Sequence, residues 1–349
     1  MKKNKKLVLI LSIVFSTILL WVAFLFPLPY YIESPGGAAD IRTVLTVGGK
    51  EDEQSGSYNF VYVQVKPATA IQLLFASLDS HSDIISKEEL AGGANSEEFY
   101  RINQFYMETS QNIAKYQGLT LAKKETSLEF FGVYVLNVTE DSTFKHILNI
   151  ADTVVSVNGK TFKSSLELIE YVSSLELGSD VRVGYVSAGQ ELTADGKIIK
   201  LENGKNGIGI GLVDHTEVKS SEQIDFQTGS IGGPSAGLMF TLAIYTQLAD
   251  SDLRDGRMIA GTGTIGEDGS VGDIGGADKK VLSAAKAGAS VFFVPNNPVD
   301  KEILKQHPDA KTNYEEAMEA VKKDKLDIEV VPVTNVKEAI DYLKKTKSQ

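Results

Sequence analysis

The sequence predicts an α+β protein of about two domains that follow an N-terminal apolar helix. The chain has 349 residues, and roughly 150 residues per domain gives about two domains. A long uncharged run lies close to the N-terminus, and from residue 207 onward short strands alternate with helices in glycine-rich sequence. This alternation is typical of a layered fold of helices on a sheet. A hydrophobic content of 42% is enough to build a core and argues against wholesale disorder.

The N-terminal run, Leu7–Phe26, contains no charged residue. About 20 apolar helical residues span the hydrocarbon core of a bilayer. The four lysines that precede the run favour a cytoplasmic N-terminus, which would leave the rest of the chain extracellular. A cleaved signal peptide is the alternative, but its apolar part would be shorter and a small-residue cleavage site would follow. We therefore expect a single-pass anchor in the cell membrane.

The overall composition excludes several classes of chemistry. A net charge of −11 disfavours a nucleic-acid-binding protein, which needs a basic surface. Without cysteine the chain has no disulfide, no thiolate metal site and no cysteine nucleophile. Four histidines in the whole chain argue against a multi-histidine metal centre. We expect no metal.

The elements before residue 120 are two strands followed by two helices. β-rich runs predict strands at 42–47 and 58–65, with glycine-containing breakers between them. Helices are predicted at 68–78 and 96–116, the second from apolar residues at helical spacing. Near the C-terminus we expect strands at 290–294 and 328–333 and a closing helix at 336–346.

Residues 128–187 have the pattern of a separate module. Its expected elements are a strand at 132–138, an apolar turn at 144–148, a strand at 152–159, a helix at 165–175 and a strand at 181–187. This order resembles a PDZ domain of the bacterial protease-associated type, although Ala151 stands where a glycine is usual. The alternative is another small αβ domain.

The PDZ resemblance implies a peptide-binding strand. PDZ domains bind an extended peptide by adding it to a sheet edge. The resemblance places the carboxylate-binding loop and the peptide-pairing strand at Gly132, Val133, Tyr134 and Val135.

A serine among small residues precedes an apolar helix candidate at 238–248. Ser235 lies in the run Gly232-Gly233-Pro234-Ser235-Ala236-Gly237. Small neighbours let a substrate backbone approach, and a helix N-terminus offers free N–H groups to an oxyanion. The alternative is a glycine-rich turn in which Ser235 only caps the helix.

No histidine accompanies this serine, but a lysine pair opens a later helix. Gly275-Gly276 precede a predicted helix at 277–287, which Gly288 ends. A lysine in its first turn, if buried near the positive helix end, would have a pKa lowered towards the range of a general base. The alternative for Lys280 is an ordinary solvated side chain.

Together the two motifs resemble the Lon-type serine protease domain, over about residues 207–349. The resemblance implies that Ser235 is the nucleophile and that Lys280, rather than Lys279, is the base. Thr262, in the run Ala260–Gly263, corresponds to a hydrogen-bond partner of the lysine. The implied oxyanion and support residues around the serine are Gly233, Pro234 and Ala236.

The layout also resembles membrane-anchored Lon-like proteases of Gram-positive bacteria with an embedded PDZ domain. The runs Tyr31–Gly37 and Ile259–Ile265 fit this subgroup. It implies that the PDZ domain interrupts the protease domain. The predicted domains are a cytoplasmic tip and transmembrane anchor at 1–27, the N-terminal part of the protease domain at 28–120, a PDZ domain at 121–205 and the Lon-type proteolytic domain at 206–349.

The predicted function is an ATP-independent endopeptidase that cleaves extracellular peptides or extended protein segments. The sequence contains no G-x-x-x-x-G-K-[ST] motif. Gly261–Gly266 matches G-x-G-x-x-G, but more turn follows it instead of a helix, so we expect neither a nucleotide nor a cofactor. The subgroup is associated with trimming secreted peptides, including streptococcal competence pheromones. The alternatives are a surface-anchored PDZ scaffold with an idle hydrolase core and a PDZ-gated quality-control protease. The sequence leaves the oligomeric state open.

Overall fold

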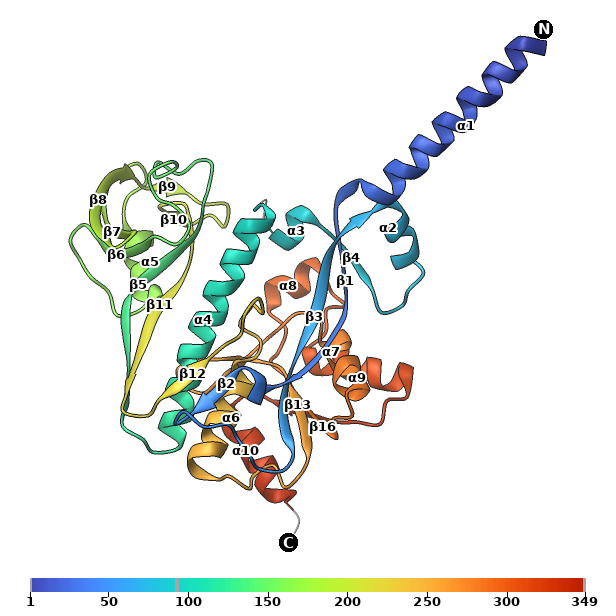
Figure 1. Cartoon of the computed structure of the whole chain (residues 1–349). Coiled ribbons are helices and arrows are strands. Elements are labelled where there is room, and N and C mark those ends of the chain that lie inside the picture. Colours follow the sequence, from blue (N-terminus) through green and yellow to red (C-terminus); the bar gives the residue numbers. More distant parts are fainter. Residues whose placement is uncertain (1, 92–93, 348–349) are drawn as a thin grey trace.

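The computed structural model describes the backbone of residues 2–91 and 94–347, with side chains from residue 10 onward in these ranges. It consists of a projecting N-terminal helix, a body built on a six-stranded sheet, and a lobe built on a five-stranded sheet (Figure 1).

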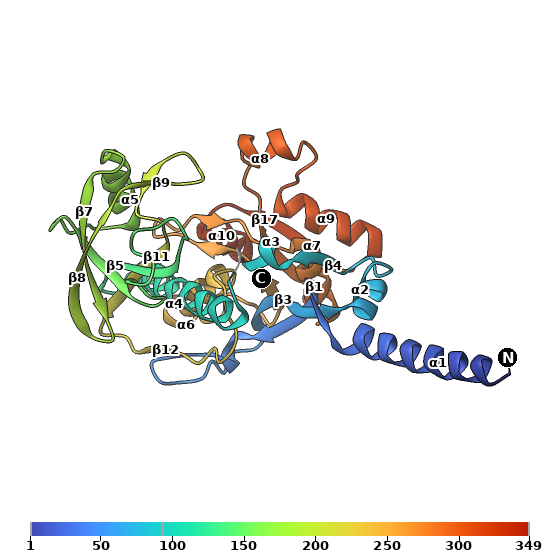
Figure 2. The same ribbon diagram turned by 90° about the horizontal axis from the view of Figure 1, so that it is seen from above.

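Helix α1 (Lys2–Leu25) extends away from the body as a straight rod (Figures 1 and 2). Its described apolar side chains are largely exposed, for example Phe15 at 65% and Trp21 at 64%. Among residues with described side chains, no helix is both long and apolar enough to cross a bilayer. The predicted span Leu7–Phe26 begins at residues whose side chains lie outside the described set. The predicted transmembrane helix therefore stays a prediction.

The six-stranded sheet of the body joins strands from both ends of the chain. Its order is β17-β16-β13-β3-β1-β4. β3 is central, because it pairs antiparallel with β1 and parallel with β13. The body therefore includes chain from before and after the lobe. The strands are β1 (Pro27–Asp40), β3 (Ser57–Thr69), β4 (Asp83–Ser86), β13 (Met258–Gly261), β16 (Val291–Pro295) and β17 (Glu329–Val333).

Helices cover both faces of this sheet because its side chains alternate between two cores. Phe60 and Phe293 point into one core, shared with α4 (Ser96–Leu121), α6 (Gly237–Ala249) and α10 (Val336–Lys345). Val61 and Phe292 point into the other, shared with α7 (Ala277–Lys286) and α9 (Asn313–Asp324). α6 is apolar all round and is buried along nearly its whole length, which fixes the loop in front of it.

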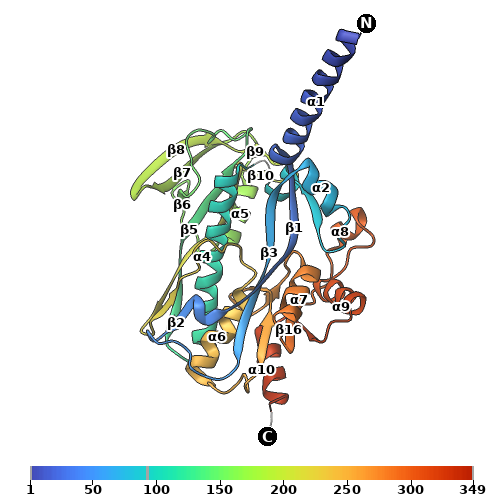
Figure 3. The ribbon, with the colours of Figure 1, turned by 45° about the vertical axis from the view of Figure 1, so that its right-hand side comes forward.

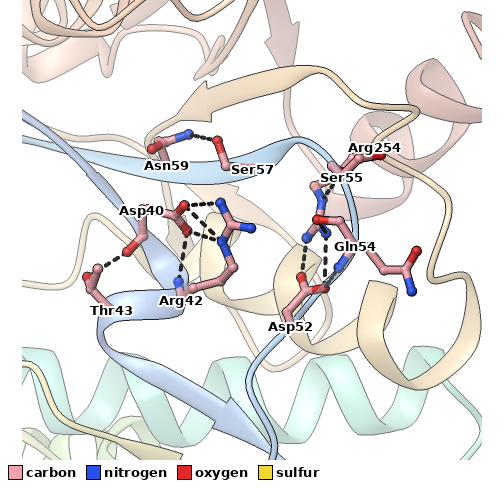
Figure 4. Close-up of polar contacts among 9 residues, drawn as sticks. All are labelled: Asp40, Arg42, Thr43, Asp52, Gln54, Ser55, Ser57, Asn59 and Arg254. Carbon is pink, nitrogen blue, oxygen red and sulfur yellow. Dashed lines mark hydrogen bonds and ion pairs between the residues drawn. The ribbon is translucent and has the colours of Figure 1, made fainter.

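A buried ion pair fastens an N-terminal loop to the chain after α6 (Figure 4). The Arg254 guanidinium bonds to both carboxylate oxygens of Asp52, and the two side chains are 2% and 4% exposed. Arg254 also donates to the Gln54 carbonyl at 3.1 Å and lies over the Tyr58 ring. The pair thus holds the start of β3 beside the start of β13.

The lobe is a sheet of order β11-β5-β6-β7-β8 with α5 (Ser165–Ser174) packed on it. β5 and β11 form a long antiparallel ribbon that connects the lobe to the body (Figures 1 and 3). The pairing runs from Thr126–Ser220 to Val138–Ile210. The strands are β5 (Thr126–Val138), β6 (Thr153–Val157), β7 (Asp180–Ser187), β8 (Gln190–Lys197) and β11 (Ile210–Ser220).

Most predicted elements are confirmed with shifted ends. The helix expected at 96–116 continues to Leu121, and the strand expected at 42–47 begins as a 3-10 turn, Ile41–Thr43. The remaining short elements are α2 (Ala70–Ala76), α3 (Lys87–Ala91), α8 (Lys301–Gln306), β2 (Leu45–Val47), β9 (Ile199–Lys200), β10 (Asn206–Gly207), β12 (Ile224–Phe226), β14 (Thr264–Ile265) and β15 (Val271–Gly272).

Candidate active site

Ser235 lies in the loop between β12 and α6, two residues before the helix begins. Gly233 has φ +88°, a left-handed conformation that favours glycine. The carbonyl of Asn103 on α4 accepts the Gly233 N–H at 2.8 Å. Ala236 is the N-cap residue of α6, so the serine sits at the positive end of a buried helix.

Lys280 reaches Ser235 from α7, which begins after Gly276 in a left-handed conformation. Its Nζ is 3.1 Å from Ser235 Oγ and 3.3 Å from Thr262 Oγ1. Burial lowers the pKa of Lys280 to about 8, and the negative charge of Glu33 acts in the opposite direction. A lysine with this pKa is partly neutral near pH 8, so it can accept a proton from the hydroxyl it faces.

Thr262 contacts the backbone carbonyl of Ser235. Its hydroxyl is fully buried and donates to the Ser235 carbonyl at 3.2 Å. The Gly263 N–H donates to the same carbonyl at 2.8 Å. The structure therefore brings together Ser235, Lys280 and Thr262, as the sequence predicted, with Thr262 contacting both members of the pair.

The predicted oxyanion donors need one correction. The Gly233 N–H already donates to Asn103, and Pro234 has no N–H, so neither residue offers a free donor. Within the described residues, the backbone N–H groups of Ser235 and Ala236 have no acceptor. These two adjacent donors at the start of α6 are the groups that can hold an oxyanion.

Lys279, the neighbour of Lys280, occupies a different environment. It is 2% exposed and bonds to Asp83 and Asp278, with Glu33 Oε1 at 3.9 Å from its Nζ. Burial opposes its charge, but the hydrogen bond to Asp83 and the nearby carboxylates outweigh burial and raise the pKa of Lys279. It stays charged, which makes it unsuitable as a base.

The carboxylate-binding loop and peptide-pairing strand predicted at Gly132, Val133, Tyr134 and Val135 have no free edge in the structure, so peptide binding there stays a prediction. These residues lie in β5, which pairs with β11 on one side and β6 on the other. Val133 and Val135 are fully buried. Strand β11 leads from the lobe back to the body and pairs along β5. It therefore occupies the side of β5 on which an added peptide would pair.

Sequence reasoning missed three residues around the pair. Asn103 and Ser110 on α4 contact the serine loop, and Glu33 on β1 faces α7. Burial raises the pKa of Glu33, against the charge of Lys279. Glu33 belongs to the run Tyr31–Gly37 that carried part of the family resemblance, which was the one available signal. No local pattern marks Asn103 or Ser110.

Comparisons with protein families match two separate parts of the chain. A family model described as PDZ domain matches residues 104–198. A model described as Lon protease (S16) C-terminal proteolytic domain matches residues 214–341. The chain therefore has a PDZ domain and a Lon-type (S16) proteolytic domain. The second match contains both Ser235 and Lys280.

Among curated proteins, the chain is similar to a Lon protease of Ureaplasma parvum serovar 3. The two are 32% identical over 134 residues, which is 34% of this chain and 16% of the relative. The chain thus spans about a sixth of that relative's length.

Among solved structures, PDZ domains of SdrC-like proteins are similar to part of the chain. The domain from Listeria monocytogenes is 35% identical, covers 24% of this chain and 90% of its own, and gives a TM-score of 0.23. The domain from Listeria innocua is 36% identical, covers 24% and 93%, and gives the same TM-score.

Proposed function

We propose that the chain is an ATP-independent serine endopeptidase in which Ser235 is the nucleophile and Lys280 the general base. The observation that carries the proposal is the 3.1 Å contact between Lys280 Nζ and Ser235 Oγ. Lys280 is buried and Ser235 is partly buried, and both lie within the region that matches the Lon proteolytic domain. A Lon-type domain is the kind in which serine peptidase activity is expected.

The geometry supports a two-step acyl transfer. Neutral Lys280 takes the hydroxyl proton as Ser235 Oγ attacks the peptide carbonyl, whose oxygen becomes negative between the N–H groups of Ser235 and Ala236. The carbon–nitrogen bond then breaks, and Lys280 returns the proton to the leaving amine. In the second step Lys280 takes a proton from the water molecule that attacks the acyl carbon. It returns this proton to Ser235 Oγ as the acyl group leaves. The Thr262 hydroxyl holds the Lys280 amino group and the Ser235 backbone in place.

We further propose that α1 attaches the enzyme to a membrane with its catalytic part outside the cell. The support is the uncharged run Leu7–Phe26 after four lysines, together with the exposure of the apolar side chains described from Ile10 to Phe26. Fractionation of cells should place the full chain with membranes, and a chain starting at Pro27 in the soluble fraction. Recovery of both in the same fraction would refute the attachment.

We propose secreted peptides or extended protein tails as substrates, including signalling peptides of the competence-pheromone kind. The matches to a PDZ domain and to a Lon-type proteolytic domain support peptide or protein substrates. Mass spectrometry of peptides secreted by cells that carry the wild type or Ser235→Ala would identify cut sites. Identical peptide sets would contradict the proposal.

A PDZ-gated protease is a second candidate, favoured by one observation. Helix α4 contacts both the lobe and the serine loop. Its Thr109 hydroxyl donates to the Asp214 carbonyl in the lobe, and its Asn103 carbonyl accepts the Gly233 N–H of the serine loop. Thr126 pairs with Ser220, so a short turn can join these two positions in place of residues 127–219. Gating predicts that this replacement raises basal cleavage, whereas substrate recruitment by the lobe predicts a loss.

The catalytic pair is tested on the full chain with a fluorogenic peptide. Ser235→Ala, Lys280→Ala and Lys280→Arg should each abolish cleavage while circular dichroism and the melting temperature stay close to wild type. Lys280→Arg is the sharper variant, because it keeps the charge and removes the base. Full activity in a folded Lys280→Ala would overturn the proposed pair.

A further inference from the structure

Two adjacent residues on α4, Thr109 and Ser110, donate hydrogen bonds from their hydroxyls to different parts of the molecule. Thr109 Oγ1 donates to the Asp214 carbonyl on β11, at 2.9 Å. Ser110 Oγ donates to the Pro234 carbonyl, also at 2.9 Å. Both residues are buried, at 9% and 4% exposure. Serine within a helix commonly bonds back to the carbonyl four residues earlier. Ser110 instead donates to a loop 124 positions away.

The carbonyl that Ser110 holds belongs to the peptide unit immediately before the nucleophile. No described peptide bond is cis, so the Pro234–Ser235 unit is planar and trans. In a trans peptide the C=O and the N–H point in opposite directions. Because Ser110 draws the Pro234 carbonyl towards α4, the Ser235 N–H points away from α4. That N–H is one of the two candidate oxyanion donors named above, and it has no acceptor among the described residues.

Few other contacts fix this orientation. The Pro234 carbonyl also accepts the Gly237 N–H, at 3.2 Å, a longer contact than the one from Ser110. The site is tightly packed, since a Cβ added to Gly237 would lie 2.8 Å from Ser110 Oγ. Removal of the Ser110 hydroxyl therefore leaves the carbonyl with the longer bond alone, and the peptide unit is free to tilt.

We propose that Ser110 is a positioning residue for the reaction proposed above: its hydroxyl sets the direction of the Ser235 N–H towards the developing oxyanion. The role rests on the proposed peptidase function. Ser110 touches neither substrate nor the reacting atoms, and it acts through the Pro234–Ser235 peptide. Its loss should weaken transition-state binding while leaving ground-state binding of the substrate unchanged.

The test compares four variants of the full chain: Ser110→Ala, Ser110→Thr, Thr109→Val and Ser235→Ala. Each is assayed for kcat and KM on a fluorogenic peptide and for the rate of covalent labelling by a fluorophosphonate, which forms a tetrahedral adduct on the serine. Loss of an entire oxyanion donor costs about 10²–10³ in kcat. A misdirected donor costs less, so we expect Ser110→Ala to lower kcat about tenfold with KM within about twofold. Labelling should fall by a similar factor.

The two neighbouring variants separate positioning from loosening of the helix. Ser110→Thr keeps the donor and should restore most of kcat. Thr109→Val removes the matching hydroxyl on the lobe side and should leave kcat within about twofold of wild type. Melting temperatures of all variants identify any loss due to misfolding. Hydrogen exchange of residues 230–238 gives a readout independent of turnover, and it should become faster in Ser110→Ala.

Several results would overturn the role. Wild-type kcat and labelling in Ser110→Ala would do so, and so would an equal loss in a folded Thr109→Val, which would indicate general loosening of α4. If the wild type neither cleaves peptides nor reacts at Ser235, the proposed peptidase function itself has failed, and the positioning role fails with it.

Discussion

Lys280 Nζ and Ser235 Oγ are 3.1 Å apart although the two residues are separated by 45 positions in the chain. Two helices that pack on the body sheet position the two residues. α6 begins just after the serine and α7 carries the lysine in its first turns, and the two pack on opposite faces of one sheet. Thr262, which follows the central strand β13, lies between them and contacts both.

The pH dependence of cleavage should follow the protonation of Lys280. The base must be neutral, and burial lowers the pKa of Lys280 to about 8. kcat should therefore rise as the pH increases from 6 to 9, with a midpoint near 8, and reach a plateau above it. Initial rates on a peptide without ionisable side chains would measure this. A profile that is flat or falls over this range would contradict Lys280 as the base.

Glu33→Gln should shift this profile to lower pH. The negative charge of Glu33 stabilises the ammonium form and so raises the pKa of Lys280, against the larger effect of burial. Removing the charge lowers the pKa further, and the neutral base is then available at lower pH. Asp83→Asn is a matched control, because Asp83 bonds to Lys279 and its side chain is 63% exposed. An unchanged midpoint in Glu33→Gln, or an equal shift in Asp83→Asn, would count against this account.

Arg254→Ala should destabilise the body of the protein. It leaves Asp52 buried without its partner, which typically costs about 3–5 kcal/mol. Denaturation by urea, followed by circular dichroism, should show a clearly lower midpoint. Arg182→Ala breaks the exposed pair with Asp195 in the lobe, where both side chains are at least 65% exposed, and should leave the midpoint near wild type. Similar midpoints for the two variants would show that burial does not decide the effect.

Gly132→Ala should destabilise the lobe rather than block peptide binding. Gly132 has φ +150°, and an added Cβ would lie 2.2 Å from the Val154 carbonyl oxygen. Backbone strain of this kind costs about 1–3 kcal/mol, and the clash adds to it. Gly178→Ala is the control, with φ +80° and nothing within 4 Å of the added Cβ. Hydrogen exchange along β5 and β6 measures the difference.

An opposite result for Gly132→Ala would be informative. Normal exchange protection together with lost binding of C-terminal peptides would show that these residues do recognise peptides, with β11 displaced during binding.

The contact between Ser235 and Lys280 was predictable from sequence because each residue lies in its own short motif. Ser235 has small neighbours before a helix, and Lys280 follows a glycine pair at a helix start. The position of β11 was not predictable, because strand pairing over 70 or more residues leaves no local pattern. The Gly233 N–H was wrongly predicted to hold the oxyanion for the same reason. Its acceptor, Asn103, lies on α4, which precedes the lobe in the chain, whereas Gly233 follows the lobe. Ser110 and Glu33 are likewise brought in by packing between distant segments.

The pairing of β3 with β13 constrains the order in which the chain folds. Ser57 pairs with Met258, so the central strands of the body meet only after the whole lobe has been synthesised. Closing a loop costs more entropy as the loop lengthens. The β5–β11 ribbon joins the two ends of the lobe at Thr126 and Ser220, and a lobe that folds early therefore shortens the loop that β3 and β13 must close. We expect the lobe to form first during synthesis and to speed the assembly of the body, so that slow folding of the lobe would delay the appearance of protease activity.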